Sequence, residues 1–441
     1  MTSFFVRPRR LAADTAWVFA GQGATALATL VGVRLITEIV PPATYGTVAL
    51  VLGVLALAQG VAVGPLMQAV LRFYPEYAAA GREMELRWGA LYALRRPALV
   101  ILGVLAVLGA VWIFSEPRKV WLIVFAFILL GVEIVRLVEV TFLNAAGRQR
   151  EMALLMAADA WMRPLFAVVL VWLYGVGDAP VIAGYVGGCS LALAAFWLVT
   201  RRRRSRSDGL PQGAMSFTGT DVSQRLWAYA LPLTLLPFIG WVSGQADRYL
   251  LASMSDIASA GIYAALYGLA SKPFLIFSNS VEFLLRQPYY SYVSVSDKIG
   301  ERIVLYLWIG IVVAGGLIFY MIYSLFYMKI AGLMLAAEYR AYSTLMGWIA
   351  GGHILLLVAQ VLERVCYAHH DTRGVVWAEA AGALFSLIAS TPLIFLYGIA
   401  GAAWAVPVYF GIQLLVTFAR VRWVLRKRRD SSAVSSSYVA I

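Results

Sequence analysis

The chain has 441 residues, of which 61% are hydrophobic and only 13% are charged. An ordinary soluble protein has about 45–50% apolar and about 25% charged residues, so a soluble fold cannot bury this much apolar surface. The composition therefore predicts a polytopic membrane protein, and this protein has a net charge of +13. Because one bilayer crossing takes about 20 apolar residues, many crossings leave no room for a large soluble domain.

Apolar stretches bounded by charges or turn residues predict twelve membrane-spanning helices. In chain order we expect these helices at residues 14–39, 46–71, 92–114, 120–144, 153–174, 180–199, 227–252, 259–284, 303–327, 341–366, 374–397 and 401–423. The predicted fold class is therefore all-α, with short connections between the spans.

The basic residues lie mostly on one side of these spans. Lys and Arg together number 36, and the loops on the other side contain only Arg118, Lys119, Lys329 and Arg340. Because Lys and Arg concentrate in cytoplasmic loops, both termini are predicted to be cytoplasmic. Most of the positive charge therefore reflects topology.

The densest basic run separates the chain into two halves. Arg201–Arg204 and Arg206 follow the sixth predicted span. They indicate a topology anchor and linker, with docking to anionic lipid head groups as the alternative. The predicted organisation is an N-terminal six-helix lobe (1–200), a cytoplasmic basic linker (201–226), a C-terminal six-helix lobe (227–423) and a cytoplasmic tail (424–441).

Short motifs recur in the two halves at a nearly constant separation, which indicates an internal repeat. The matching motifs are Arg34, Tyr45-Gly46 and Arg72-Phe73-Tyr74-Pro75 in the first half, and Arg248, Gly261-Ile262-Tyr263 and Arg286-Gln287-Pro288-Tyr289 in the second. Segments 144–150 and 367–373 form a later pair. Because six helices return the chain to the same side, the repeat is predicted to be parallel. Two such bundles usually flank a central cavity that opens alternately to each side.

Catalytic and metal-binding motifs are missing from the sequence. It contains neither a GxxxxGK[ST] phosphate loop nor an HExxH pair. His353 is predicted to pack in the interior, and His369 and His370 to form a solvated loop pair. Cys189 and Cys366 are predicted to be buried, inert thiols. No catalytic residue, metal site or cofactor is expected, so the sequence favours transport over catalysis.

Charged side chains within the spans are the main functional candidates, because a charge at mid-bilayer costs about 2.5–3.5 kcal/mol on insertion scales. A carboxylate within one helical turn allows a cation to be neutralised locally. The groups with such a partner are Arg34 with Glu38, Arg136 between Glu133 and Glu139, and Asp159 with Arg163. Each of these groups is open to a structural or a functional interpretation.

Two further cations lack such a partner. Arg248 has only Asp247 beside it, and adjacent residues do not face each other on a helix. Lys272 has no carboxylate within two turns, so it is predicted to be a free cation in a water-filled cavity. Arg163-Pro164 and Lys272-Pro273 both place a cation before a mid-span proline. Such a proline kinks the helix and frees a backbone carbonyl, here that of Ala160 or Leu269.

The in-span cations predict an anionic substrate. They are Arg34, Arg136, Arg163, Arg248 and Lys272. One carboxylate would not need so many cations, whereas a pyrophosphate can use them through forked contacts from Arg and the point charge of Lys. A carboxyl group at low dielectric can bind and release a proton near neutral pH, so Asp159 and Glu133 are the candidates for ion coupling.

Several segments resemble the bacterial oligosaccharide and polysaccharide flippases of the multidrug/oligosaccharidyl-lipid/polysaccharide exporter superfamily. The segments are Arg34-Leu35-Ile36 with Pro41–Gly46, Arg72–Tyr77, Asn144–Arg148, and Asp247-Arg248-Tyr249 with Ala260–Ala265. Members usually carry an acidic residue where this chain has Ala43-Thr44, at a surface turn. The resemblance implies two six-helix lobes around a central cavity. It also implies ion-driven export of undecaprenyl-pyrophosphate-linked sugar units to the periplasmic leaflet.

The resulting hypothesis is a multi-pass flippase of the bacterial inner membrane that exports lipid-linked oligosaccharides for surface polysaccharide synthesis. Expected partners are the lipid-linked substrate, membrane lipids, H+ or Na+, and a polysaccharide polymerase and glycosyltransferases; no nucleic acid is expected. The rivals are a multidrug exporter of the same superfamily, a non-transporting scaffold of a polysaccharide synthase, and a membrane glycosyltransferase. Exporters of cationic drugs should have acidic cavities, and a glycosyltransferase should have a catalytic loop domain.

Overall fold

The computed structural model describes residues 8–204 and 219–438, with side chains described for 16–200 and 220–427. Every regular element in these ranges is a helix, which confirms the all-α prediction. The chain divides into two compact units, Met1–Phe238 and Ile239–Ile441. We describe each unit by itself. The predicted basic residue Arg206 lies outside the described residues.

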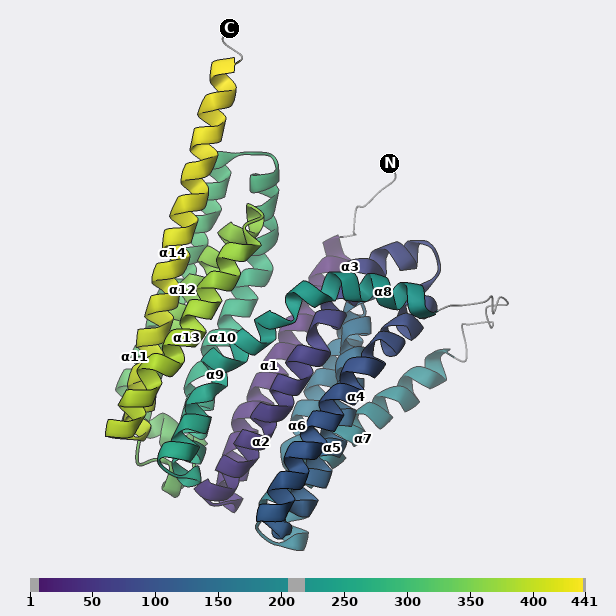
Figure 1. The fold of residues 1–441 in the computed structure, drawn as a ribbon, viewed down its shortest axis with the longest axis vertical. Helices are drawn as coiled ribbons and strands as arrows, with labels where there is room; N and C mark the ends of the chain where they lie inside the picture. The colour runs from purple at the N-terminus through teal and green to yellow at the C-terminus, as the bar shows by residue number, and fades with distance from the viewer. Residues whose placement is uncertain (1–7, 205–218, 439–441) are drawn as a thin grey trace. The chain divides into compact units, whose positions relative to one another are not determined.

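The N-terminal unit is built from eight described helices. They are α1 (Pro8–Ile39), α2 (Pro42–Ala62), α3 (Gly64–Ala79), α4 (Glu83–Ser115), α5 (Val120–Ala145), α6 (Gln149–Tyr174), α7 (Asp178–Arg204) and α8 (Gly219–Ala230), with the 3₁₀ turns η1 (Pro117–Lys119) and η2 (Leu231–Leu233). Helix α6 packs against both α1 and α7, and α5 packs against α7. One buried hydrophobic cluster of this unit lies among α1, α2, α5, α6 and α7, and a second lies among α3, α4, α5 and α8; Figure 1 shows the arrangement of these helices.

The predicted span at 46–71 is two helices in the structure. Helix α2 ends at Ala62, and α3 begins at Gly64 after the single residue Val63. Pro65 occupies the first turn of α3, where no backbone N–H is needed for a helical hydrogen bond. In the middle of one continuous helix, the same proline would have removed a backbone hydrogen bond. The break therefore divides what the sequence predicted as one continuous span.

Helix α8 belongs to the N-terminal unit, although the sequence-based division assigned residues up to 226 to a linker. Val222 and Leu226 are buried in a hydrophobic cluster with Leu86 and Ala90 of α4. Gly89 permits this close approach, because a Cβ there would lie 2.5 Å from a methyl group of Val222. Burial of these apolar side chains thus holds α8 against α4. Figure 1 shows α8 crossing α3 and α4 near one end of the two helices.

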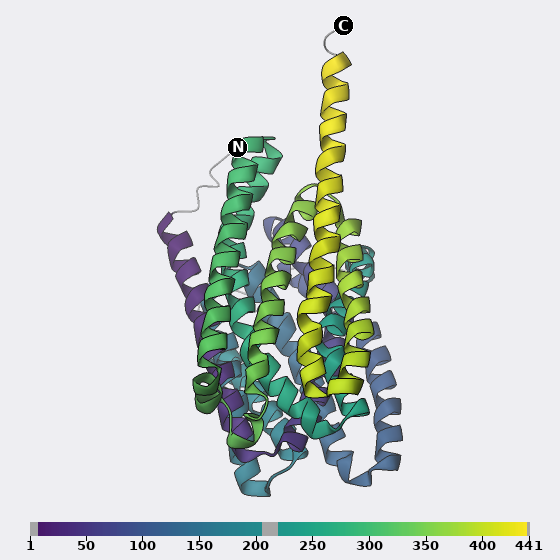
Figure 2. The same ribbon diagram turned by 90° about the vertical axis from the view of Figure 1, so that its left-hand side faces the viewer.

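The C-terminal unit contains the remaining helices. They are α9 (Leu235–Met254, which begins just before the boundary), α10 (Ile257–Ser294), α11 (Lys298–Met334), α12 (Met346–Ala368), α13 (Thr372–Tyr397) and α14 (Ile399–Tyr438), with the 3₁₀ turns η3 (Ala337–Tyr339) and η4 (Ser343–Leu345). Helix α12 packs against α10, α11 and α14. Figure 2 shows α14 continuing beyond its neighbour α13 into the segment predicted as a tail.

The number of possible membrane spans agrees with the prediction. In the described residues, eleven helices are long and apolar enough to cross a membrane. The pair Thr220–Leu233 and Leu235–Met254, bent by 40° at its break, brings the number to twelve if it is one span. All twelve predicted stretches therefore correspond to helical segments, and the chain is a multi-pass membrane protein.

Two helix ends are alike at positions that the predicted internal repeat pairs. Gly147, two residues after the end of α5, has a φ of 67°, and His370, two residues after the end of α12, has a φ of 60°. In the first turn the N–H of Arg148 donates to Leu143 O at 2.9 Å. In the second turn the N–H of Asp371 donates to Cys366 O at 2.8 Å. Both helix ends thus use the same left-handed cap, at the positions that the sequence repeat pairs.

One more pair of helix ends matches in the same way. Gly81 after α3 and Ser296 after α10 have φ values of 68° and 58°. Gly175 after α6 and Gly398 after α13 also have positive φ, but their ψ values of 169° and −128° differ, so these two ends do not share one conformation. A positive φ therefore recurs at corresponding helix ends of the two halves, with the same cap in two of the three pairs.

Candidate functional site

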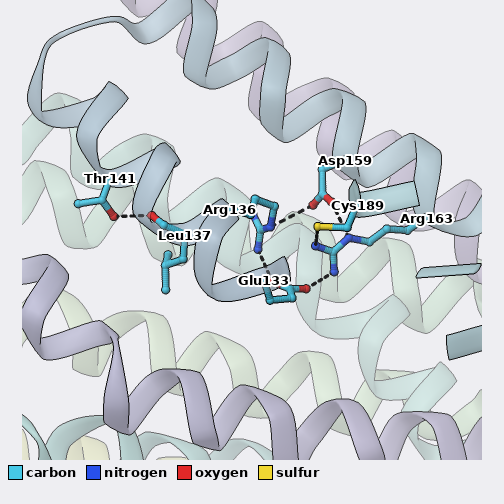
Figure 3. Close-up of polar contacts among 7 residues, drawn as sticks. All are labelled: Glu133, Arg136, Leu137, Thr141, Asp159, Arg163 and Cys189. Atoms are coloured by element: carbon cyan, nitrogen blue, oxygen red, sulfur yellow. Dashed lines mark hydrogen bonds and ion pairs between the residues drawn. The ribbon is translucent and has the colours of Figure 1, made fainter. Parts of the chain in front are cut away.

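The N-terminal unit contains a buried network of four charged side chains. Glu133 and Arg136 come from α5, and Asp159 and Arg163 come from α6 (Figure 3). Arg163 Nε lies 2.7 Å from Asp159 Oδ1, and its Nη1 contacts Glu133 Oε1. Arg136 Nη2 lies 2.7 Å from Glu133 Oε2, and its Nε lies 3.5 Å from Asp159 Oδ2. Two arginines thus neutralise two carboxylates.

Close helix packing holds this network together. A Cβ at Gly188 of α7 would lie 2.6 Å from the backbone of Met162 and Arg163, and one at Gly184 would lie 2.2 Å from Ala167. The glycines therefore let α7 approach α6 at the Arg163 turn. The neighbouring Cys189 is fully buried and accepts a hydrogen bond from Arg163 Nη2 at 3.4 Å. Its burial agrees with the predicted inert thiol, and Cys366 is buried as well.

The partners of Arg136 differ from the sequence-based expectation. Arg136 was placed between Glu133 and Glu139, but Glu139 instead forms an ion pair with Arg87 of α4. The second carboxylate near Arg136 is Asp159, on a different helix. Spacing along one helix could not reveal this, because the contact depends on how α5 packs against α6.

Arg34 forms the predicted ion pair on α1. Its Nη2 lies 2.8 Å from Glu38 Oε2, and the two side chains are 33% and 57% exposed. Arg34 Nη1 is buried and has no hydrogen-bond partner in the structure. One nitrogen of this guanidinium therefore remains open to a further acceptor.

Arg248 of α9 is buried, with 6% of its surface exposed, and the expectation that Asp247 does not face it is wrong. Arg248 Nη1 donates to Gln245 Oε1 and to Gly244 O, each at 2.6 Å, and lies 3.4 Å from Asp247 Oδ1. Its Cζ lies 4.6 Å from the ring centre of Tyr267, a cation–π arrangement. The guanidinium folds back along its own helix, which the spacing argument did not consider.

Asp247 is also held by the aromatic side of this cluster. Tyr263 donates from its hydroxyl group to Asp247 Oδ2 at 2.6 Å. Tyr263 and Tyr267 come from α10, so α10 contacts α9 through a carboxylate, a guanidinium and two phenol rings. From the sequence, Tyr263 was predicted only as part of a repeated motif, and Tyr267 was not predicted as a site residue. Their spacing of four residues on α10 was the available signal.

Lys272 of α10 is half-buried and forms no hydrogen bond or ion pair with the described residues. The carbonyl of Leu269, which Pro273 was expected to free, accepts a hydrogen bond from the hydroxyl group of Tyr323 at 2.8 Å. A neighbouring helix thus satisfies the broken backbone, and the ammonium group stays without a protein carboxylate.

The environments of His353 and His370 agree with the prediction, and that of His369 does not. His353 is 1% exposed, and its ring lies near those of Tyr267 and Phe274, so it packs in the interior as predicted. His369 is not solvated: its Nε2 lies 3.1 Å from Glu301 Oε1, and both side chains are 9% exposed. His370 is exposed. The described residues contain no group of metal-binding side chains.

Glu363 of α12 is a buried carboxylate that the sequence analysis missed. It is 4% exposed and accepts a hydrogen bond from Gln413 Nε2 of α14 at 3.1 Å. Among the described residues it takes part in no ion pair, whereas its neighbour Arg364 pairs with Glu282. The signal was its place within a predicted span, close to its end.

A comparison with known protein families identifies the family of this chain. The family described as polysaccharide biosynthesis protein matches residues 11–282, more than half of the chain. The chain belongs to this family. A search of curated protein sequences finds no match to this chain.

Solved structures share the fold of this family member. The lipid II flippase MurJ in an inward closed conformation has a TM-score of 0.64 and 12% identity, covering 93% of this chain and 87% of its own. An outward-facing multidrug resistance MATE family transporter of the MOP superfamily has a TM-score of 0.63 and 13% identity, covering 95% and 96%. The eukaryotic MATE transporter AtDTX14 has a TM-score of 0.62 and 11% identity, covering 96% and 98%.

The likeness covers nearly the whole chain and concerns the fold. A lipid II flippase and a multidrug resistance MATE family transporter thus share the fold of this chain. The predicted family resemblance and fold class are therefore confirmed.

Proposed function

We propose that this protein is a flippase that moves lipid-linked oligosaccharides from the cytoplasmic to the periplasmic leaflet of a bacterial inner membrane. The observation that carries the proposal is Lys272, a half-buried cation within a predicted span that forms no ion pair among the described residues. Membership of the polysaccharide biosynthesis protein family supports the sugar-linked substrate. A pyrophosphate head group offers the negative charge that Lys272 lacks.

The candidate cations take different roles in this proposal. Lys272 and Arg248, both in the C-terminal unit, contact the anionic head group. In the N-terminal unit, Arg34 Nη1 has no hydrogen-bond partner among the described residues, so Arg34 stays a candidate for substrate binding in that unit. Arg136 and Arg163 are already matched by two carboxylates. They act as counter-ions of Glu133 and Asp159, because removing one of them to bind substrate would leave a buried carboxylate unpaired.

Glu363 is a better candidate for ion coupling than Glu133 or Asp159. Each of the latter two is bound by two arginines, so taking up a proton would break ion pairs. Glu363 has an amide donor and no ion pair among the described residues, so it can exchange a proton without that cost. We propose Glu363 as the proton-carrying residue and Glu133 with Asp159 as the structural pair.

A multidrug exporter is the second candidate, because MATE transporters share the fold. Exporters of cationic drugs need unpaired carboxylates in their binding site. Among the described residues Lys272 has no carboxylate partner, and the buried carboxylate of α9, Asp247, is already bonded to Arg248 and Tyr263. The local charge therefore favours an anionic substrate.

Complementation tests the function and the site separately. A strain lacking this gene receives the wild type, Lys272→Ala, Arg248→Ala or the control Arg302→Gln, which removes an exposed cation on α11. Surface polymer is then measured at matched protein levels. We expect polymer with the wild type and the control, and little with the two site variants. A wild type that restores nothing contradicts the function, whereas full polymer from both site variants contradicts only the site.

A further inference from the structure

A pocket of about 460 Å³ lies between α4 and α8 in the N-terminal unit, away from the charged network of α5 and α6. Its wall contains Arg95 and Arg96, both exposed. Neither arginine takes part in a hydrogen bond or ion pair among the described residues, whereas Arg87 on the same helix pairs with Glu139. The pocket therefore offers two adjacent guanidinium groups without a protein anion.

The position of these arginines along α4 places them at head-group level. The apolar segment from Pro97 to Phe114 spans about 27 Å at 1.5 Å per residue. This length is close to the ~30 Å thickness of the hydrocarbon core. Arg95 and Arg96 directly precede this segment, so they lie at its membrane–water interface.

Below the pocket, α4 presents an apolar face with no protein cover within its unit. Leu99, which also lines the pocket, is 59% exposed, and Val100 and Val107 are 64% and 65% exposed. Acyl chains are the natural cover for such a face in a bilayer, so the pocket opens where lipid is expected.

The other pocket residues suit a polar head group. Thr220, Ser223 and Gln224 of α8 bring two hydroxyl groups and a side-chain amide to the wall opposite the arginines. Tyr92 and Trp227 complete it, and such rings prefer the head-group region. Trp227 Nε1 donates to Ala93 O at 3.2 Å, which fixes α8 against α4.

We propose that this pocket binds the phosphate group of an anionic glycerophospholipid, whose acyl chains lie along the exposed face of α4. Two guanidinium groups can hold a phosphate through several charge-assisted hydrogen bonds. Basic pockets of this kind beside membrane helices bind anionic head groups. The site uses neither of the proposed substrate cations, Lys272 and Arg248, and its lipid links α8 to α4.

Native mass spectrometry of the full-length protein tests the proposal. The protein is mixed with phosphatidylglycerol or phosphatidylcholine, and the retained lipid is titrated. We expect Arg95→Gln/Arg96→Gln to bind phosphatidylglycerol about 10- to 30-fold more weakly, with phosphatidylcholine binding unchanged. Arg95→Lys/Arg96→Lys keeps both charges and should retain most of the affinity.

A matched control removes two exposed cations outside the pocket, Lys298 and Arg302 of α11. Lys298→Gln/Arg302→Gln has the same net charge as Arg95→Gln/Arg96→Gln and should bind phosphatidylglycerol like the wild type. Equal affinity in the wild type and the Arg95→Gln/Arg96→Gln variant would overturn the proposal, as would an equal loss in the control. Inorganic phosphate distinguishes the source of the anion: displacement of the lipid at millimolar phosphate would contradict a lipid site.

Discussion

Arg163 and Asp159 form a buried ion pair one turn apart on α6, with Nε 2.7 Å from Oδ1. The same guanidinium contacts Glu133 of α5. Arg163→Ala leaves Arg136 to neutralise both carboxylates. We expect the free energy of unfolding to fall by about 3–5 kcal/mol, because an uncompensated charge remains buried. The thermal unfolding midpoint in detergent measures this effect.

Asp159→Asn in the Arg163→Ala background provides the control for the charge argument. It restores a one-to-one match between Arg136 and Glu133, so the double variant should unfold at a higher temperature than Arg163→Ala alone. If the two variants have the same midpoint, loss of packing rather than unpaired charge explains the effect.

Glu363 carries the prediction on ion coupling. Glu363→Gln keeps the shape of the side chain and a contact to Gln413 but cannot exchange a proton. We expect it to reduce polymer assembly strongly in a strain lacking the gene, at a normal protein level. In infrared spectra of the purified protein, a carboxyl band that appears as the pH is lowered should lose the Glu363 component.

The isosteric change Glu116→Gln, at an exposed carboxylate between α4 and α5, serves as the control. It should leave both polymer assembly and that infrared component unchanged. Normal polymer assembly by Glu363→Gln would exclude the residue as the carrier. Glu133→Gln and Asp159→Gln should instead lower the amount of folded protein, since each leaves part of a guanidinium unpaired.

The fold could be predicted from the sequence to a large extent, because hydrophobic length and charge asymmetry are properties of single segments. All twelve apolar stretches correspond to helical segments. The repeat was visible in motifs such as Arg34 and Arg248, and it reappears in the helix ends at Gly147 and His370. The local sequence motifs and the order of the helices therefore agree.

The charge pairing could not be predicted, because it depends on which faces of different helices meet. Arg136 contacts Asp159 across two helices rather than the nearer Glu139. Arg248 folds back along α9 to Gln245, a rotamer choice that spacing does not determine. Glu363 was missed because a lone carboxylate near the end of a span resembles an interfacial residue. Packing, rather than composition, separates these cases.

Asp371, between α12 and α13, carries a pH-dependent contribution to stability. Arg420 Nε lies 2.5 Å from its Oδ2, and this hydrogen-bonded guanidinium lowers the pKa of the Asp371 carboxyl group. Because the folded pKa lies below the unfolded value of about 3.9, the contribution is present above that value and is lost as pH falls through the folded pKa. Arg420 is 33% exposed, so we expect no more than about 1 kcal/mol.

Asp371→Asn tests this contribution. Asn still accepts a hydrogen bond as the first residue before α13, as Asp371 does from Gly374 N, so only the charge is removed. The wild type should be more stable than the variant at neutral pH, and the difference should shrink as the pH approaches 3. A difference that is constant from pH 7 to pH 3 would show that the ion pair contributes nothing.

The paired helix ends give the last prediction. Gly147 and His370 occupy corresponding caps with φ values of 67° and 60°, a conformation that costs a residue with a Cβ about 1–2 kcal/mol. A Cβ at Gly147 would meet no atom within 4 Å, so Gly147→Ala isolates the backbone cost and should destabilise the protein by about 1 kcal/mol.

His370→Gly should have the opposite sign, because it removes that strain at an exposed side chain. The gain is smaller, since glycine gains entropy in the unfolded chain. Gly131→Ala, within α5 and with open space at its Cβ, is the control and should stabilise slightly through helix propensity. If Gly147→Ala and Gly131→Ala shift the unfolding midpoint equally, the left-handed cap at the end of α5 imposes no measurable cost.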